Sequence, residues 1–388
     1  MTSSTAVLLF NLGGPDDLAS VEPFLVNLFT DREIIQLPGG AALQPWVARL
    51  IAKMRGPSVR NNYRRIGGGS PQLRITRQQA QALEDRLNSA RGPRERPEGS
   101  AALAAPVSAS EWGWGPTSSN KSSTADAYRV FVAMRYSQPT ADDALRAISD
   151  AGITRIITLT LFPHWSKATT GSSRNEFERV LSSPRWKDSR FAITHIEHYA
   201  DDPLYIEALT DTVRVAWNDI PERRRARTVL LFSAHGLPQR FIDEGDPYVG
   251  HIDATRFGVL ERLDLPNRQL LAFQSRTGPV KWIGPGTEEV LAELGDEGVS
   301  DVLIIPLSFV SDHIETLYEV DMLFADAARD AGITGYYRPP ALNCHPLFIE
   351  ALAKLVTDHN GAPTPHRNQR HAHPARLRAV VDEPALVD

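Results

Sequence analysis

The sequence predicts an α/β protein made of two copies of one unit, each with a parallel sheet flanked by helices. The apolar run 302–307 is bounded by polar residues, which is typical of a strand buried on both faces of a parallel sheet. Such runs alternate with helical segments along the chain, and this alternation favours sheets covered by helices on both sides. At 388 residues the chain is long for one core, so we expect two domains.

Three matches in the same order predict the duplication. Each copy has an apolar strand and a turn that ends in proline, then a helix that opens on two acidic residues, then a second apolar strand. In the helix match, Pro139-Thr140 is paired with Gly286-Thr287. The matching segments are 7–10 with 229–232, 139–143 with 286–289, and 150–163 with 296–309.

We expect the first copy to occupy residues 1–200 and the second copy residues 201–358. Residues 89–126 are rich in Ala, Ser, Pro and Gly without periodicity, which predicts a disordered insertion in the first domain. Residues 359–388 are polar and contain several prolines, which predicts a flexible tail.

The composition is that of an ordinary globular protein, with 42% hydrophobic and 23% charged residues. A net charge of −5 argues against a nucleic-acid partner, which usually requires a basic surface. The single cysteine, Cys344, excludes a disulfide framework and a cysteine-held cluster or zinc site in this chain. The N-terminus lacks the features of a signal peptide, and no stretch reaches the roughly 20 apolar residues of a membrane span. We expect a cytoplasmic protein, free or in peripheral contact with the inner face of the membrane.

The chain begins with a strand at 7–10 that runs into Gly13-Gly14-Pro15. Paired glycines after a strand let the backbone turn sharply and approach a ligand. The G-x-G-x-x-G spacing of a dinucleotide site is absent. The pattern of residues 17–30 then predicts an amphipathic helix.

Residues 34–54 are apolar but interrupted by prolines and glycines, so we do not expect a regular core element. We expect a loop that exposes Leu37, Leu43 and Trp46, as at a ligand mouth or a membrane contact. A helical hairpin packed on its own domain is the alternative, and the sequence leaves both open. Residues 60–72 place three arginines before three glycines, which predicts either a mobile basic loop for carboxylates or phosphates or a solvated run of charges.

Three predicted strands are followed by a histidine, namely His164, His235 and His313. Glu315 and Glu319 follow the last of these and are four residues apart, so one helical face would carry both carboxylates. Open α/β sheets bind ligands at the carboxyl ends of their strands, and imidazole with carboxylates suits a proton or a metal ion. The alternative is a set of capping histidines and a first helical turn whose acids are favoured by the helix dipole.

The chain contains, in this order, the phrases LLFNLGGP, YRRIGGGSP, SAHGLP and SFVSDHIETLYEVD. Together they resemble ferrochelatase, which inserts ferrous iron into protoporphyrin IX in the last step of haem synthesis. The resemblance covers about residues 6–356 without 89–126. It implies two Rossmann-like, chelatase-type domains with the porphyrin in the cleft between them. It also implies ferrous iron as a substrate and no permanently bound cofactor.

The resemblance implies roles for the strand-end residues. His235 is similar to the histidine that accepts pyrrole protons or handles the metal, and Glu315 is similar to its acidic partner. His313 would support them, and Glu319 would continue an acidic path along the helix. His164 matches a position that helps bind metal in some bacterial members.

The resemblance also implies a porphyrin-binding side. Residues 34–54 resemble the apolar lip through which the porphyrin enters, and Leu12 matches a variable position that faces the macrocycle. Arg55 and Ser70 match positions near the propionates. The full set of implied substrate contacts is Leu12, Arg55, Tyr63, Ser70, Trp282 and His313.

Three departures from the family pattern stand out. Gly236 replaces a serine that commonly follows the catalytic histidine, and Met54 stands where some relatives have a second arginine. The C-terminal cysteines that hold an iron–sulfur cluster in some members are absent, so we expect no cluster.

Metal insertion requires a base at the ring centre, because two pyrrole protons leave as the ion enters. Neutral imidazole suits this role, and a nearby carboxylate orients it. The sequence leaves protoporphyrin and coproporphyrin open as substrates, although the apolar 34–54 segment favours protoporphyrin. The alternatives are a chelatase for a corrin precursor or sirohydrochlorin, and a porphyrin carrier that needs no base.

Overall fold

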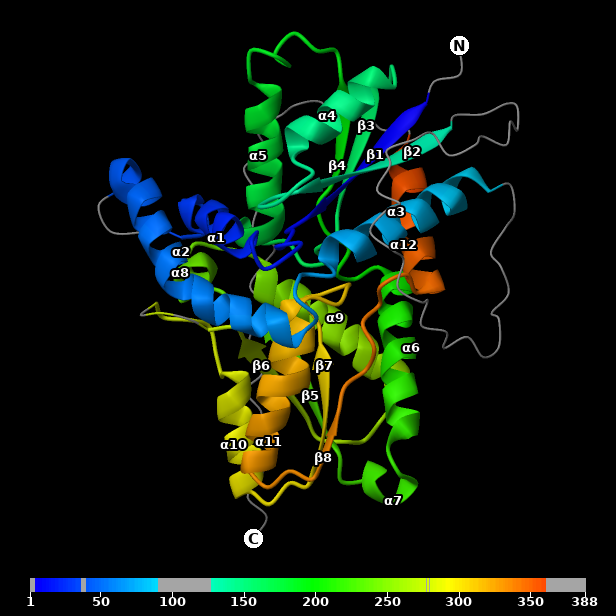
Figure 1. The fold of residues 1–388 in the computed structure, drawn as a ribbon. Coiled ribbons are helices and arrows are strands. Elements are labelled where there is room, and N and C mark those ends of the chain that lie inside the picture. The colour runs from blue at the N-terminus through cyan, green and yellow to red at the C-terminus, as the bar shows by residue number, and fades with distance from the viewer. Residues whose placement is uncertain (1–3, 36–39, 90–126, 277, 279, 361–388) are drawn as a thin grey trace.

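The computed structural model describes residues 4–35, 40–89, 127–276, 278 and 280–360. Nearly all of the predicted insertion and tail, and also Leu37, lie outside this part of the chain. Figure 1 shows two sheets, one above the other, with helices on both sides of each. The α/β fold class is therefore confirmed.

Two four-stranded sheets form the framework, and all their strand pairs are parallel. The strand order is β2-β1-β3-β4 in the first sheet and β6-β5-β7-β8 in the second. The strands are β1 (Thr5–Asn11), β2 (Tyr128–Met134), β3 (Arg155–Thr160), β4 (Ala192–Ile196), β5 (Val229–His235), β6 (Gln269–Gln274), β7 (Asp301–Pro306) and β8 (Gly335–Tyr337). The same order in both sheets confirms the predicted duplication.

The turns before the matching helices correct one detail of the repeat. Met134 N–H donates to the carbonyl of Pro139 at 2.7 Å, and Phe273 N–H donates to the carbonyl of Pro285 at 2.9 Å. The two prolines are therefore equivalent, and the helices begin after Thr140 and Gly286. The pairing of Pro139-Thr140 with Gly286-Thr287 was wrong by one residue, because the N-cap residues Thr140 and Gly286, each three residues before an acidic residue, are the equivalent ones.

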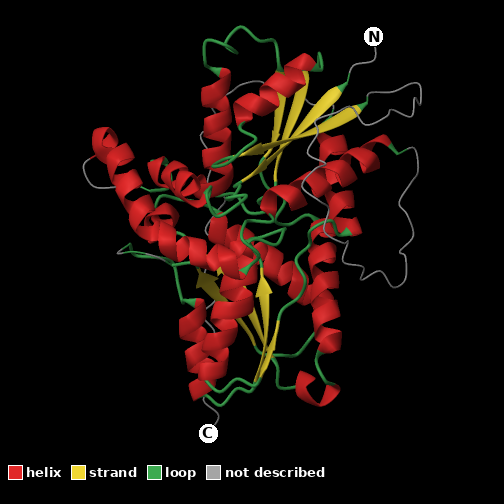
Figure 2. Cartoon of the chain, in the orientation of Figure 1, coloured by secondary structure: helices red, strands yellow, loops and turns green. Residues whose placement is uncertain are grey.

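Helices cover both faces of the two sheets (Figure 2). They are α1 (Val21–Thr30), α2 (Gly40–Arg65), α3 (Gln72–Asn88), α4 (Ala141–Asp150), α5 (Ser172–Leu181), α6 (Pro203–Asp219), α7 (Glu222–Arg225), α8 (Gln239–Asp243), α9 (Tyr248–Leu263), α10 (Thr287–Asp296), α11 (Ala325–Asp330) and α12 (Pro346–His359). Two π-helical segments, η1 (Lys167–Gly171) and η2 (Glu315–Phe324), follow the strands β3 and β7.

The central strands are buried on both faces, as their continuous apolar runs predict. In β1, Leu8 and Phe10 pack with residues of α4 and α5. Val7 and Leu9 point the other way, into a cluster that includes residues of α3, α6, α9 and α12. Alternate residues of one strand thus serve two separate cores.

The last helix returns to the first half of the molecule, where α12 lies beside α3 (Figure 1). Arg86 of α3 and Glu350 of α12 form a two-pronged ion pair, with 2.7 Å between Arg86 Nη2 and Glu350 Oε1. One apolar cluster continues from Val7 in the first sheet to Leu303 in the second. The first sheet ends at Ile196 and the second begins at Val229, but one apolar cluster is shared by both, and the domain boundary at residue 200 stays a prediction.

The loop expected within residues 34–54 is wrong from Gly40 onward, because α2 runs unbroken through Pro45 and Pro57 to Arg65. Helices α1 and α2 form a hairpin, which was the alternative reading. Their buried contact is made by Val21, Phe24, Leu25, Phe29, Ala48 and Ala52. Tertiary packing thus overrides the helix-breaking tendency of two prolines.

The mobile basic loop expected over residues 60–72 is wrong for its first half, since 60–65 belong to α2. The Arg60 side chain is held in place, with Nη2 3.1 Å from Glu22 Oε2 and Nε donating to the Leu18 carbonyl at 3.2 Å. Residues 66–71 alone form the glycine-rich turn.

Candidate active site

The candidate site lies at the carboxyl ends of three strands of the second sheet. His235 is the last residue of β5 and Gln274 the last of β6, and η2 follows β7. Because the strands are parallel, their carboxyl ends meet at one edge, which is where open α/β sheets bind ligands.

His235 has a defined tautomer. Its Nδ1 lies 2.6 Å from the carbonyl oxygen of Gly236, and because a carbonyl only accepts, Nδ1 carries the hydrogen. Burial lowers the pKa of His235, while the nearby Glu315 carboxylate opposes that shift. The neutral ring therefore presents the lone pair of Nε2, which can accept a proton.

His313 and Glu315 lie next to each other at the start of η2. His313 is buried, and its Nδ1 donates to the Ser311 carbonyl at 3.0 Å. Its Nε2 lies 3.1 Å from Glu315 Oε2.

Phe309 lies between the two histidines. Its ring centroid is 4.1 Å from that of His313 and 6.0 Å from that of His235, with edge-to-face geometry in both pairs. This apolar ring limits water between the imidazoles, and a low local dielectric strengthens their interaction with charge.

Glu319 is the second carboxyl group of the site. Its Oε2 accepts from Ser275 Oγ at 2.5 Å and from Gln274 Nε2 at 3.2 Å. Burial, followed by repulsion from Glu315, raises the pKa of Glu319 to about 7. The two carboxyl groups are thus close enough to interact, as their spacing predicted, although the helix that carries them is a π-helix, a form often found at functional sites.

The first half contributes residues from the β1 turn and α2. Tyr63 is buried in a cluster against which Leu12 and Ile314 pack. Burial raises the pKa of Tyr63, and the Glu315 carboxylate adds to that shift. A Cβ added to Gly14 would lie 2.6 Å from Ser70 Oγ, so the glycine turn lets Ser70 approach the β1 end closely.

The other two implied porphyrin contacts have different surroundings. Arg55 is exposed on α2, with its guanidinium carbon 5.7 Å from the ring centroid of Phe29. Trp282 is half-buried, and a Cβ added to Gly236 would lie 3.4 Å from its Cε3. Trp282 thus lies beside the residue that follows His235, whereas Arg55 lies against Phe29 of α1.

His164 is hydrogen-bonded to α9 and not to another strand-end residue. It is 2% exposed, and its Nε2 lies 2.9 Å from Thr255 Oγ1. That hydroxyl donates to the Ala200 carbonyl at 2.6 Å, so it accepts from His164. Burial lowers the pKa of His164 to about 3.

Tyr248 lies between His164 and His235. The Tyr248 ring packs on His164, and the Tyr248 hydroxyl donates to the His235 carbonyl at 3.0 Å. Metal binding by His164 stays a prediction.

Sequence reasoning missed Gln274, Ser275 and Phe309. The first two lie at the end of β6, a strand whose carboxyl end the sequence analysis did not use. The rule that ligands bind at strand ends would have identified them once β6 was placed beside β5.

Helix α2 exposes a stripe of large apolar side chains at helical spacing, as the sequence predicted for Leu43 and Trp46. We call this stripe the α2 apolar face; its members and exposed fractions are Leu43 53%, Trp46 71%, Leu50 59% and Met54 72%. Among the described residues, the helices are too short or too polar to cross a membrane.

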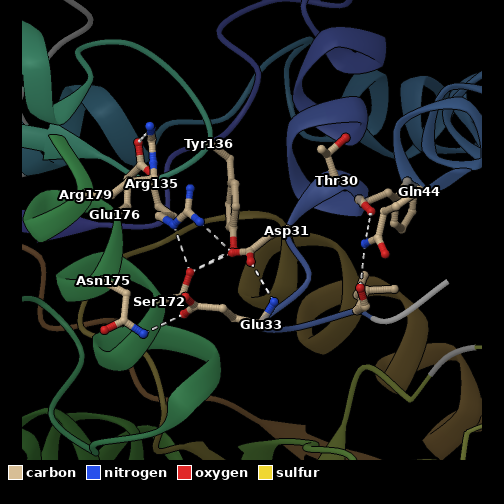
Figure 3. A network of polar contacts seen from close by, with 12 residues as sticks. Thr30, Asp31, Glu33, Gln44, Arg135, Tyr136, Ser172, Asn175, Glu176 and Arg179 are labelled. Carbon is tan, nitrogen blue, oxygen red and sulfur yellow. Dashed lines mark hydrogen bonds and ion pairs between the residues drawn. The ribbon is translucent and has the colours of Figure 1, made fainter. Parts of the chain in front are cut away.

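A buried polar network anchors the chain between α1 and α2 (Figure 3). The carboxylate of Asp31, which is 4% exposed, accepts from Arg135, Tyr136 and Ser172, each at 2.7 Å. The donors come from the end of the first sheet and from the start of α5. The base of the α1–α2 hairpin is thus tied to the first sheet.

Comparison with known proteins identifies the family of this chain. The family model described as Ferrochelatase matches residues 4–98 and 117–360. Ferrochelatase of Geotalea daltonii is 47% identical over 361 residues, which cover 93% of this chain and 99% of that protein. Ferrochelatase of a Synechocystis strain is 40% identical over 354 residues, which cover 91% of this chain and 81% of that protein.

Among solved structures, the sirohydrochlorin chelatase SirB from Bacillus subtilis subspecies spizizenii, in complex with cobalt, aligns at a TM-score of 0.45. The identity is 14%, over 92% of this chain and 95% of SirB. The family match and the close sequence relatives decide the assignment. This chain belongs to the ferrochelatase family.

Proposed function

We propose that this protein inserts ferrous iron into protoporphyrin IX and releases two protons, giving protohaem. The observation that carries the proposal is the neutral His235, whose Nε2 can accept a proton at the strand edge. Glu315 lies at the same edge, and its carboxylate acts to raise the pKa of His235, so it would stabilise the imidazolium that forms.

The proton transfers follow from these groups. Each pyrrole N–H bond breaks, its electron pair stays on the nitrogen and binds the iron, and the proton goes to Nε2 of His235. From there it passes toward Glu315 and then toward Glu319. A carboxyl group whose pKa is about 7 both accepts and releases protons at neutral pH.

Iron is proposed as a substrate, and no resident cofactor or iron–sulfur cluster is proposed. Cys344 is the single cysteine of the sequence, and a cluster needs several thiolates. Within the described residues, no three His, Cys, Asp or Glu side chains are grouped so as to hold a metal ion. His235, Glu315 and Glu319 would therefore guide the ion briefly, and the ring nitrogens would replace its water ligands.

The α2 apolar face supports protoporphyrin as the substrate and a membrane surface as its source. Four large apolar side chains point to solvent there, and exposed patches of this kind mark interaction sites. Arg49 and Lys53 are exposed on the same helix and would meet anionic headgroups. Coproporphyrin carries more carboxylates and would gain less from this surface.

The porphyrin itself would lie between α2 and the strand ends. Tyr63 and Leu12 would contact the macrocycle from the first half, and Trp282 from the second. Ser70 and Arg55 would serve its propionates, since a hydroxyl and a guanidinium both donate to carboxylates.

The test is anaerobic insertion of ferrous iron into protoporphyrin IX by the unsubstituted protein and by His235→Ala. We expect turnover in the first and a loss of about 10²- to 10⁴-fold in the second, with porphyrin binding kept. His195→Ala is the matched control, because His195 is a half-buried histidine of β4 whose Nδ1 lies 2.7 Å from Thr158 Oγ1.

The alternatives give different results in the same assay. Porphyrin binding without turnover in the unsubstituted protein would favour a carrier. Faster insertion into coproporphyrin or sirohydrochlorin than into protoporphyrin would reassign the substrate. Turnover that survives His235→Ala would move the base elsewhere and make His164 the next residue to substitute.

A further inference from the structure

We infer that Gln274 is a positioning residue that holds Glu315 and Glu319 at a fixed distance from His235. The inference rests on the proposed function and extends it to a side chain outside the set that would touch the substrate. Gln274 ends β6, the edge strand that pairs with β5, and is opposite His235 in that pairing.

The Gln274 side chain spans two elements. It is 1% exposed, and its Oε1 accepts from Ser233 Oγ at 2.9 Å, two residues before His235 on β5. Its Nε2 donates to the carbonyl of Glu315 at 3.3 Å and to Glu319 Oε2 at 3.2 Å. One amide therefore connects the strand of the base to the helix of the acids.

The orientation of this amide follows from chemistry. The Glu315 carbonyl is an acceptor, and the ionised Glu319 carboxylate also only accepts, so the NH₂ group must face them. The Oε1 atom then faces Ser233, whose hydroxyl can donate. A buried amide with both ends bonded is rigid, and breaking either end leaves an unpaired polar group, which is costly.

The backbone of Gln274 makes a second link to the base. Its carbonyl accepts from the N–H of Gly236 at 2.8 Å. A Cβ at Gly236 would lie only 2.8 Å from that same oxygen, so glycine lets the two strand ends come this close. The Gly236 carbonyl in turn receives Nδ1–H of His235 at 2.6 Å. Gln274 is thus one bonded step from the group that sets the tautomer of the base.

The next residue reinforces the same contact. Ser275 has a left-handed backbone with φ of 62°, a conformation that is uncommon for residues other than glycine. Its hydroxyl donates to the same Glu319 Oε2 at 2.5 Å. Two consecutive residues therefore hold one carboxylate oxygen of Glu319.

The expected consequence is a loss of turnover with little loss of porphyrin binding. Misplacing a catalytic group by about 1 Å costs up to about 100-fold in rate, whereas the porphyrin contacts proposed above do not involve Gln274. Gln274→Met keeps the length of the side chain and removes its hydrogen bonds. We expect its kcat to fall about 10- to 100-fold, with KM for protoporphyrin unchanged.

Gln274→Glu supplies a readout that a purely structural role would not give. At low pH the protonated carboxyl group that this substitution introduces can donate to Glu319, and at high pH its ionised form repels Glu319. The ratio of the variant's kcat to that of the unsubstituted protein should therefore fall as pH rises. The amide of the unsubstituted protein does not titrate, so the ratio isolates this contact.

Thr210→Val is the control for loss of a buried hydrogen bond. Thr210 is fully buried in α6, and its hydroxyl donates to the Ile206 carbonyl at 2.8 Å. We expect this variant to lower the midpoint of thermal unfolding and to keep kcat. All variants are compared at a temperature where each is folded by circular dichroism.

The outcomes separate the two claims. If the unsubstituted protein inserts no iron, the proposed function fails and this inference fails with it. If it turns over and Gln274→Met keeps its kcat, or loses no more than Thr210→Val, only the positioning role is overturned. A rise in KM for protoporphyrin at constant kcat would also overturn it, because Gln274 would then act in binding.

Discussion

The two halves of the molecule share one strand order but end their central strands differently. In the first half β1 ends at Asn11, whose side chain is engaged at both ends: Nδ2 donates to Thr76 Oγ1 at 3.0 Å, and Oδ1 accepts from the Gln72 side chain at 3.0 Å. In the second half β5 ends at His235, whose Nδ1 is bonded to the Gly236 carbonyl while Nε2 keeps its lone pair. The side chain at the end of β1 is therefore hydrogen-bonded through both of its polar atoms, whereas His235 at the end of β5 keeps a nitrogen lone pair that can accept a proton.

The π-helical segments after β3 and β7 repeat this contrast. In the first half η1 carries no carboxylate, and Ser166 before it donates to a buried Asp246 at 2.9 Å. In the second half η2 carries Glu315 and Glu319. Duplication thus supplied one framework twice, but His235, Glu315 and Glu319 lie on the second copy alone, which agrees with the general rule that function lies in residues placed on a fold.

The largest expected effect tests whether the second half alone carries the reaction. Glu315→Gln removes the negative charge beside His313, and we expect kcat to fall about 10²- to 10⁴-fold. Glu350→Gln is the matched control, because the two side chains are 20% and 25% exposed and each is in an ion pair. Both variants are measured by anaerobic insertion of ferrous iron. If Glu350→Gln lost as much activity as Glu315→Gln, the assignment of the reaction to the second half would be wrong.

The next effect tests whether the first half carries stability. Asp31→Ala leaves Arg135 beside an empty site, and removing one partner of a buried pair typically costs about 3 to 5 kcal/mol of unfolding free energy. Asp326→Ala is the control, since Asp326 is 52% exposed in its pair with Arg329 and surface pairs contribute about 0 to 1 kcal/mol. Urea denaturation measures both. Lost turnover at unchanged stability in Asp31→Ala would contradict the division between the halves.

A smaller effect concerns pH. The pKa of Glu319 is raised from 4.5 to about 7, so between these values the folded state binds more protons than the unfolded state, and the free energy of unfolding falls as pH rises. As a proton acceptor Glu319 must be ionised, so kcat should rise with pH through about 7.

Glu319→Gln should abolish both trends while leaving the protein folded. The measurements are kcat and urea midpoints between about pH 5 and 8. A kcat profile that keeps its limb near pH 7 in this variant would assign that limb to another group.

The smallest effect concerns the α2 apolar face. Trp46→Gln should weaken binding to vesicles that contain anionic lipid, because an aromatic side chain that is 71% exposed is removed from the contact. The unfolding free energy should change by no more than about 0.5 kcal/mol, as for other surface changes. Val215→Gln, at a position that is 54% exposed on α6, is the control and should not alter vesicle binding in a flotation assay.

The strands and the strand-end histidines were predictable because burial on both faces leaves continuous apolar runs. The path of 40–65 was not predictable in this way, since Pro45 and Pro57 argue locally against a helix that only its packing on α1 explains. The burial of His164 was also not predictable from local sequence, because its hydrogen-bond partner Thr255 is 91 residues away. Gln274 was missed because its role depends on Ser233 and Glu319, which no local pattern connects to it.

The return of α12 to the first sheet has a consequence for synthesis. A ribosome releases the first sheet long before residues 346–359 are made, so the face of α3 that α12 covers is left open to solvent during elongation. The contact between α3 and α12 therefore forms only after the end of the chain has been made. Such a long-range contact is expected to form slowly, and the apolar surface of α3 that is open until then favours aggregation.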